Sequence, residues 1–358
     1  EPEPDPDAWR GEIDTWSGPS GWRAQETIGS TASQSQTSSP RWEPSEFGLD
    51  LSHLDGLNEN QRQAATHVDG PCLVSAGAGS GKTRAVIARI VQLIRVHRVP
   101  PSSILAVTFT RKAAAEMGER IRAVLGDEAT KNIRIQTYHS CALRLLRTYA
   151  VDVGLRPRFS LWDETAAQRR VRDIIRETIE TSAYPDLKRE YTAGIILDGV
   201  NKAKEEWGPE SMDSAGNLII KKEHLTPMEV SLLSRSDTRV EREAYAAHVN
   251  RKSEAPQTGT FVPAAVQMKE IQSIRAGYEA LKNEVGAVDL SDLIYLVVLN
   301  AHRLPDFQAQ VSSRWDYIIV DEYQDSNNLQ ERFIQVLGGE LRNVMVVGDD
   351  DQSIYGWR

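Results

Sequence analysis

The chain has 358 residues, of which 42 are Lys or Arg, 51 are Asp or Glu and 40% are hydrophobic, a composition typical of a globular protein of two or three domains. The longest near-continuous apolar run, Leu293 to Leu299, is far shorter than the ~20 residues that cross a bilayer, so we expect no membrane-spanning segment. The two cysteines, Cys72 and Cys141, are too few for a disulfide scaffold or a structural zinc site. We expect both to be reduced thiols in the core of an intracellular protein.

The net charge of −9 is unevenly distributed along the chain. Residues 1–50 carry ten acidic and three basic side chains, so the rest of the chain is nearly neutral. Attraction to phosphates depends on local rather than total charge. The composition therefore leaves a nucleic-acid partner open.

Residues 1–50 are rich in Pro, Ser, Gln and acidic residues and show no sustained apolar period, which predicts a disordered acidic tail. Four of the chain's eight tryptophans lie there, at Trp9, Trp16, Trp22 and Trp42. Bulky aromatic residues are depleted in segments that are merely solvated, so a short motif that docks on a protein partner is one interpretation. A translated extension without function explains the same residues equally well.

From Leu51 onward, short apolar segments alternate with segments whose apolar residues recur at helical spacing. This alternation indicates a parallel α/β sheet, whose ligand site lies at the carboxyl ends of its strands. The predicted strands are Cys72 to Ala76, Ile104 to Phe109, Ile133 to Thr137, Tyr317 to Val320 and Val344 to Val347. The first predicted helix begins at Lys82. Three further helices are predicted, at Arg111 to Leu125, His139 to Ala150 and Leu329 to Leu337.

Residues 155–285 interrupt this alternation. They are charged and mostly helical in pattern, with a predicted N-cap at Asp163. Strand patterns resume only after them. We therefore expect a helical subdomain inserted into the α/β domain.

A glycine-rich segment lies between the first predicted strand and the first predicted helix. Its glycines let backbone N–H groups approach phosphates, Lys82 reaches the β- and γ-phosphates, and Thr83 ligates Mg²⁺. A glycine-rich turn of purely structural purpose is the alternative, but strand, Gly-Lys-Thr and helix are all in the register of a phosphate loop. The predicted nucleotide-binding residues here are Ala76, Gly77, Ala78, Gly79, Ser80, Gly81, Lys82 and Thr83.

Two adjacent acids follow a later apolar strand, at Asp321 and Glu322. In a phosphate-loop enzyme, an acid at the end of a neighbouring strand holds Mg²⁺, and a second acid can orient and deprotonate the attacking water. Asp321 fits the first role and Glu322 the second. Without the phosphate loop, the pair would be interpreted as solvated loop residues.

The segment Gly348 to Arg358 also follows an apolar strand. The amide of Gln352 can sense a γ-phosphate, and Tyr355 and Trp357 offer ring faces on which unpaired bases stack. Two aromatic residues packed in a core are the alternative. If the amide and the rings act together, they couple nucleotide state to a bound strand.

These motifs together resemble the superfamily 1A DNA helicases of the UvrD, PcrA and Rep type, over residues 57–358. The family's phosphate loop begins with alanine, as Ala76 does here, and Gln61 is similar to the glutamine of its adenine-reading motif. Two further segments, Thr108 to Met117 and Thr137 to Ser140, resemble the family's DNA-contacting motifs. Arg111 stands where asparagine is usual, and Tyr138 where phenylalanine is usual. The resemblance implies DNA contacts by Thr108, Phe109, Thr110, Thr137, Tyr138, His139, Tyr355, Trp357 and Arg358.

The resemblance also implies the domain organisation. We expect a RecA-like P-loop domain, 1A, at residues 51–154 and 286–358, with an inserted helical subdomain, 1B, at residues 155–285. The family continues into a second lobe, with subdomains 2A and 2B, that contributes arginines to the γ-phosphate. The sequence ends at Arg358, so we expect the ATP-binding half of a motor that is inactive or weakly active in hydrolysis by itself.

The implied activity is that of an ATP-dependent DNA helicase that uses Mg²⁺, translocates 3′ to 5′ on single strands and unwinds forked DNA in repair or replication. Lys82, Glu322 and Gln352 are then the catalytic residues, with Thr83 and Asp321 as metal ligands. We expect a cytoplasmic, nucleoid-associated protein, or a nuclear one in a eukaryote. Two alternatives stay open: a non-catalytic module that binds ATP or single-stranded DNA, and the helicase part of a RecB- or AddA-type helicase-nuclease.

Overall fold

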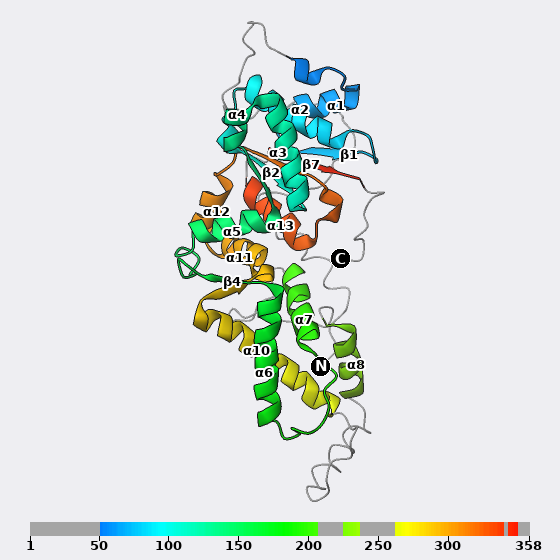
Figure 1. Cartoon of the computed structure of the whole chain (residues 1–358), viewed down its shortest axis with the longest axis vertical. Coiled ribbons are helices and arrows are strands. Elements are labelled where there is room, and N and C mark those ends of the chain that lie inside the picture. Colours follow the sequence, from blue (N-terminus) through cyan, green and yellow to red (C-terminus); the bar gives the residue numbers. More distant parts are fainter. Residues whose placement is uncertain (1–50, 207–224, 237–261, 340–342, 350–358) are drawn as a thin grey trace, which may run out of the picture.

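The computed structural model describes residues 51–206, 225–236, 262–339 and 343–349. Within these ranges the molecule is elongated, with an α/β part at one end and a helical part at the other (Figure 1). Some predictions lie outside the described residues, namely those for the tail 1–50 and for Gln352, Tyr355, Trp357 and Arg358.

Five strands of the described chain form one parallel sheet, in the order β1-β7-β6-β2-β3. The sheet confirms the predicted parallel α/β fold class. The observed ends differ from the predicted ones by no more than a residue. Four of the strands are short apolar runs bounded by polar or turn-forming residues, whereas β3 carries the polar side chains of Arg134, Gln136 and Thr137. The strands are β1 Cys72–Ser75, β2 Ile104–Thr108, β3 Arg134–Thr137, β6 Tyr317–Val320 and β7 Val344–Gly348.

Helices cover both faces of the sheet because its central strands are apolar on both sides. On β2, Ile104 and Ala106 lie in one hydrophobic core, while Leu105 and Val107 lie in the other. The first core is closed by α1 (Glu59–Thr66), α2 (Lys82–Arg95) and α3 (Arg111–Leu125). The second is closed by α5 (Tyr138–Thr148), α11 (Leu290–Arg303), α12 (Pro305–Ser312) and α13 (Asn328–Gly338).

Shorter elements connect these layers. None of the helices in the described part of the chain combines the length and the hydropathy needed to cross a bilayer. The short elements are η3 Ser52–Leu54, η4 Pro101–Ser103, α4 Asp127–Asn132 and the 3-10 turn η7 Tyr323–Asp325.

The helical part is inserted between α5 and α11 (Figure 1). At its base, the parallel strands β4 and β5 pair, with Trp162 opposite Asp289, so the chain leaves and re-enters the α/β part at adjacent points. The sequence analysis did not predict these two strands, because three residues are too few for a periodic signal. The predicted N-cap is confirmed: the Asp163 side chain accepts a hydrogen bond from Ala166 N–H. The elements are β4 Ser160–Trp162, α6 Glu164–Thr181, α7 Ala193–Glu205, α8 Pro227–Ser236, α10 Ala264–Val285 and β5 Ala287–Asp289.

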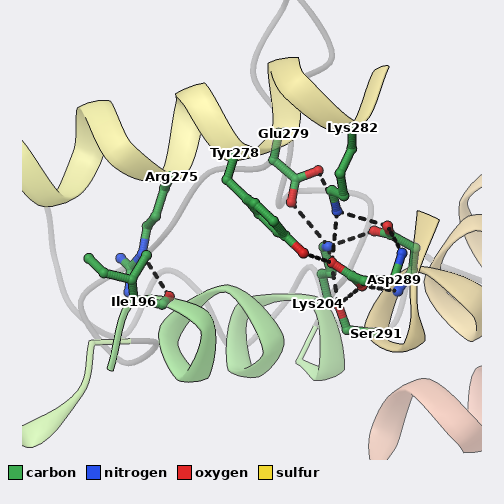
Figure 2. A network of polar contacts seen from close by, with 9 residues as sticks. Ile196, Lys204, Arg275, Tyr278, Glu279, Lys282, Asp289 and Ser291 are labelled. Carbon is green, nitrogen blue, oxygen red and sulfur yellow. Dashed lines mark hydrogen bonds and ion pairs between the residues drawn. The ribbon is translucent and has the colours of Figure 1, made fainter. Parts of the chain in front are cut away.

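A buried ion-pair network joins the two parts (Figure 2). Lys204 of α7 and Lys282 of α10 are each only 2% exposed. Lys204 Nζ lies 2.6 Å from Asp292 Oδ1 and 3.1 Å from Glu279 Oε1. Lys282 Nζ lies 3.0 Å from Asp289 Oδ2 and 2.8 Å from Asp292 Oδ2. Because Asp289 is the N-cap of α11 and Asp292 lies in its first turn, these five residues, the lysine network, tie the insertion to the α/β part.

Candidate nucleotide and nucleic-acid site

The loop between β1 and α2 has the backbone geometry of a phosphate cradle. Gly79 and Gly81 have φ angles of 70° and 84°, in the left-handed region that favours glycine. Gly81 is also the N-cap of α2, so the loop ends where a helix N-terminus offers free backbone N–H groups to an anion. Ala76 N–H donates to Gly348 O at 3.0 Å, which ties the start of the loop to the end of β7.

Lys82 closes over this loop. Its ammonium donates to Ala76 O at 2.8 Å and to Gly77 O at 3.4 Å, and it forms an ion pair with Asp349 Oδ2 at 3.1 Å. The Lys82 side chain is 11% exposed and that of Asp349 is 4% exposed, so the pair is largely shielded from water. The Lys82 ammonium therefore lies against the predicted phosphate loop, and the Asp349 carboxylate supplies the negative charge that a bound phosphate would supply.

Gln61 reaches the same loop from α1. Its side chain completes a capping box with Asn58: Asn58 N–H donates to Gln61 Oε1 at 3.0 Å. Its Nε2 donates to Ser80 O at 2.5 Å. Each end of the amide thus makes one hydrogen bond, and the second N–H of Nε2 and the second lone pair of Oε1 are the groups with which it would contact an adenine. The adenine-reading role of Gln61 stays a prediction.

Asp321 and Glu322 lie directly after β6, at the same edge of the sheet as the loop. Asp321 is 7% exposed, and its N–H continues the sheet by donating to Val107 O at 3.0 Å. Burial, and to a smaller extent the charge of Glu322, raises the pKa of the Asp321 carboxyl, while Lys82 lowers it. A divalent cation here would compensate the buried carboxylate, so the residues fit the predicted magnesium site.

Glu322 has an unusual backbone conformation. Its φ of 55° and ψ of 44° are left-handed, which is rare for a residue with a side chain. Its carboxylate accepts a hydrogen bond from Gln324 Nε2 at 2.7 Å. The strained backbone turns the chain sharply at the end of β6 and begins the turn η7.

The predicted DNA-contacting residues of the first two motifs lie at the ends of β2 and β3. These ends adjoin, because Thr108 is opposite Thr137 in the parallel register. Thr110 and Thr137 are the N-caps of α3 and α5, and accept hydrogen bonds from backbone N–H groups of those helices. Thr108 is buried, and its hydroxyl donates to Thr110 O at 3.0 Å. The threonine side chains therefore shape the two turns.

The aromatic and imidazole side chains at these turns differ in exposure. Phe109 is half-buried and His139 is exposed. Tyr138 is only 2% exposed; its ring packs near Phe333, and its hydroxyl lies 2.8 Å from Ser326 Oγ. In this arrangement no base can stack on Tyr138, whose role here is to fix α5 against the segment after η7. A DNA contact by His139 stays a prediction.

Two residues near the nucleotide loop had no assigned role in the sequence analysis. Asp349 pairs with Lys82, and Gln324 links Glu322 to the backbone N–H of Asp349. Both lie inside the motifs that drew attention to Asp321 and Gly348. Their positions inside those motifs could have marked both residues as part of the site. The sequence does not show, however, that Asp349 pairs with Lys82 or that Gln324 bonds to Glu322 and to the backbone of Asp349.

The comparison with protein families agrees with this geometry. The family described as "UvrD/REP helicase N-terminal domain" matches residues 57–358. The chain belongs to this family. Its UvrD/REP relatives include "ATP-dependent DNA helicase PcrA" of Leuconostoc citreum, 31% identical over 306 residues that make up 85% of this chain and 34% of the relative. "DNA helicase II" of Haemophilus influenzae is 33% identical over 315 residues, 87% of this chain and 36% of the relative. PcrA of Staphylococcus aureus strain Mu50 is 29% identical over 306 residues, again 85% of this chain and 34% of the relative.

This UvrD/REP chain thus spans about a third of the length of the curated relatives that it matches. The structure brings Gln61, Lys82, Asp321 and Glu322 to one edge of the sheet, beside the glycine-rich loop. It brings the turns with Phe109 and His139 to the ends of the neighbouring strands. Thr83, the other predicted metal ligand, lies in the first turn of α2, and the predicted residues Gln352, Tyr355, Trp357 and Arg358 lie after Asp349, outside the described residues.

Proposed function

We propose that this chain carries the ATP-binding part of an ATP-dependent DNA helicase. One observation supports this above the others. Lys82 Nζ donates to Ala76 O of the glycine-rich loop at 2.8 Å, and the buried carboxyl of Asp321 lies at the same edge of the parallel sheet, as a phosphate-binding cation and a ligand of Mg²⁺ would. We further propose the domain division 51–154 with 286–358, and 155–285.

In the proposed mechanism, Lys82 leaves the carbonyl groups of the loop and the carboxylate of Asp349, and neutralises the β- and γ-phosphates of ATP. Thr83 and Asp321 would hold Mg²⁺, which supplies charge compensation for the phosphates. Glu322 orients the attacking water and accepts its proton. Gln352, beyond the described residues, would read the γ-phosphate.

Single-stranded DNA is proposed to bind across the ends of β2 and β3, at the same edge of the sheet as the nucleotide loop but separated from it by β6 and β7. The half-buried Phe109 and the exposed His139 would face it there. Tyr355, Trp357 and Arg358 would extend the same surface and stack bases. Translocation 3′ to 5′, unwinding of forked duplexes in DNA repair and a cytoplasmic location are proposed from the family alone. A protein partner for residues 1–50 is proposed from the four tryptophans of that segment.

Nucleotide binding is the direct test of the proposed site. In a titration with a fluorescent, non-hydrolysable MgATP analogue, Lys82→Ala should weaken binding at least tenfold, since it removes the cation of the phosphate cradle. Lys131→Ala is the matched control, because Lys131 is exposed on α4, where it pairs with Glu128. Equal affinities for Lys82→Ala and the wild type would refute the assignment.

A further inference from the structure

Gln324 occupies a bridging position between two strands of the sheet. It lies in η7, after β6, and its Nε2 donates to Glu322 Oε2 at 2.7 Å. Its Oε1 accepts a hydrogen bond from Asp349 N–H, at the end of β7, at 3.0 Å. One side chain thus holds the predicted water-activating carboxylate and the end of a neighbouring strand at the same time.

The chemistry of the two partners fixes which way the amide points. A backbone N–H can only donate, so the oxygen of the Gln324 amide must face Asp349. The nitrogen must then face Glu322, where a carboxylate can accept its hydrogen bond. The two side chains closest to it in length cannot replace it in this way, because ionised glutamate lacks the donor and methionine offers only a weak acceptor.

The absence of a side chain at Gly348 makes room for this bridge. A Cβ atom at Gly348 would lie 2.9 Å from Gln324 Oε1 and 3.3 Å from Gln324 N. The close approach ties η7 to the end of β7, whose Asp349 side chain in turn pairs with Lys82. A continuous set of contacts therefore runs from Lys82 through Asp349 and Gln324 to Glu322.

We propose that Gln324 is a positioning residue that holds the Glu322 carboxylate at the angle needed to orient water, and that it transmits the position of the β7 end to that carboxylate. Glu322 needs such support because its left-handed backbone leaves its side chain in a strained turn. The inference rests on the proposed ATP hydrolysis, since it assigns a partner to the residue that activates water. Gln324 itself touches neither water nor nucleotide in this scheme.

The test measures hydrolysis and binding separately. Hydrolysis is measured under single-turnover conditions, with the full chain in excess over MgATP and with single-stranded DNA present. Such an assay can measure even a slow rate of hydrolysis. Gln324→Ala should lower this rate roughly 10- to 100-fold, because a misplaced catalytic group costs that much. Affinity for the non-hydrolysable MgATP analogue should stay within about twofold of the wild type. Gln324→Glu keeps the length and the acceptor for Asp349 N–H but loses the donor, and should be at least as slow as Gln324→Ala.

A double-mutant cycle isolates the effect on Glu322. If Gln324 acts only through that carboxylate, Glu322→Gln combined with Gln324→Ala should hydrolyse ATP no more slowly than Glu322→Gln alone. Multiplied losses in the double variant would overturn the proposal. Gln308→Ala is the matched control, because Gln308 donates a hydrogen bond to Val336 O, which joins α12 to α13 away from the Lys82–Asp349–Gln324–Glu322 contacts, and should leave the rate unchanged.

A crystal structure of Gln324→Ala gives a readout that does not depend on turnover. We expect the Glu322 carboxylate to move while the β1-β7 pairing is kept; an unmoved carboxylate would overturn the proposal whatever the rate. The outcomes also separate this inference from the proposed function. If Glu322→Gln is slow and Gln324→Ala hydrolyses like the wild type, only the inference fails, whereas an affinity for the MgATP analogue that Lys82→Ala leaves unchanged would refute the proposed function itself.

Discussion

At the scale of single residues, backbone conformation decides how the nucleotide loop can change. Gly77 has an ordinary backbone conformation, and a Cβ built on it meets nothing within 4 Å. Gly81 has φ of 84°, and a Cβ there would lie 2.6 Å from Gln61 Nε2. Both are glycines of the same loop, but only Gly81 has a backbone conformation and a neighbour that exclude a side chain in the absence of a ligand.

This contrast predicts that alanine separates binding from stability at the two positions. Gly77→Ala should leave the free energy of unfolding unchanged within ~1 kcal/mol, yet weaken nucleotide binding because its Cβ occupies space that a phosphate needs. Gly81→Ala should lower the free energy of unfolding by about 1 kcal/mol or more, because it adds both backbone strain and a clash. Urea unfolding and nucleotide titration of both variants measure this. Wild-type nucleotide affinity in Gly77→Ala would argue against a phosphate above that residue.

The neighbouring residues Tyr138 and His139 supply a second test at this scale. Tyr138→Phe should lower the free energy of unfolding by about 1 kcal/mol, through the lost hydrogen bond with Ser326, and leave DNA affinity unchanged. His139→Ala should leave the free energy of unfolding unchanged and weaken DNA binding, since its side chain is exposed at the proposed DNA surface. Fluorescence anisotropy with labelled single-stranded DNA distinguishes them. If Tyr138→Phe weakens DNA binding and His139→Ala does not, the DNA contact belongs to Tyr138, and the proposed contact by His139 is wrong.

At the scale of elements, the lysine network determines how α7 and α10 are held against α11. Burial alone would raise the pKa of Asp289, but the charges of Lys204 and Lys282 hold it well below its usual range. A carboxyl whose pKa is lower in the folded state stabilises the fold above its unfolded pKa of about 4. That contribution is lost as the pH falls below about 4, toward the folded pKa.

Removing one cation of the network should therefore have a large, pH-dependent cost. At pH 7, Lys282→Met should lower the free energy of unfolding by about 3–5 kcal/mol, since it leaves buried carboxylates undercompensated. The difference from the wild type should narrow below pH 4, where the Asp289 carboxyl becomes protonated in the unfolded chain and the stabilisation that its lowered pKa gives to the wild type is lost. Lys131→Met, on the exposed surface, should change stability by less than about 1 kcal/mol. Urea unfolding at pH 7 and pH 3 checks both statements, and a gap that stays constant with pH would contradict this electrostatic account.

At the scale of the whole molecule, charge is separated along the sequence. Residues 1–50 contribute most of the excess of acidic residues, while the part that holds the proposed DNA surface is nearly neutral. Repulsion between an acidic segment and phosphates acts over a Debye length and is screened by salt. The overall charge of −9 therefore overstates the repulsion that residues 51–358 exert on DNA.

Deletion of residues 1–50 should consequently strengthen binding of single-stranded DNA several-fold at low salt. The difference should disappear as the salt concentration rises, because screening removes the repulsion. Anisotropy titrations over a range of salt concentrations measure it. A loss of affinity on deletion would show instead that the tail contributes contacts to DNA.

The sequence by itself determined the parallel sheet, the helices that cover it, the glycine-rich loop before Lys82 and the paired acids Asp321 and Glu322. These features are local: each depends on a short run of residues whose periodicity, turn chemistry or order is visible without neighbours in space. The same local patterns carried the family resemblance, which the match over residues 57–358 confirmed.

Only the tertiary structure decided which of these residues face one another. Lys82 and Asp349 are 267 positions apart, and Tyr138 and Ser326 are 188 apart, so neither pair leaves a trace in local periodicity. The burial of Tyr138, the bridge made by Gln324 and the lysine network arise where strands and helices distant in sequence pack together. Because a buried polar group must find its partner in the folded chain, these contacts follow from the packing of whole elements rather than from any one segment.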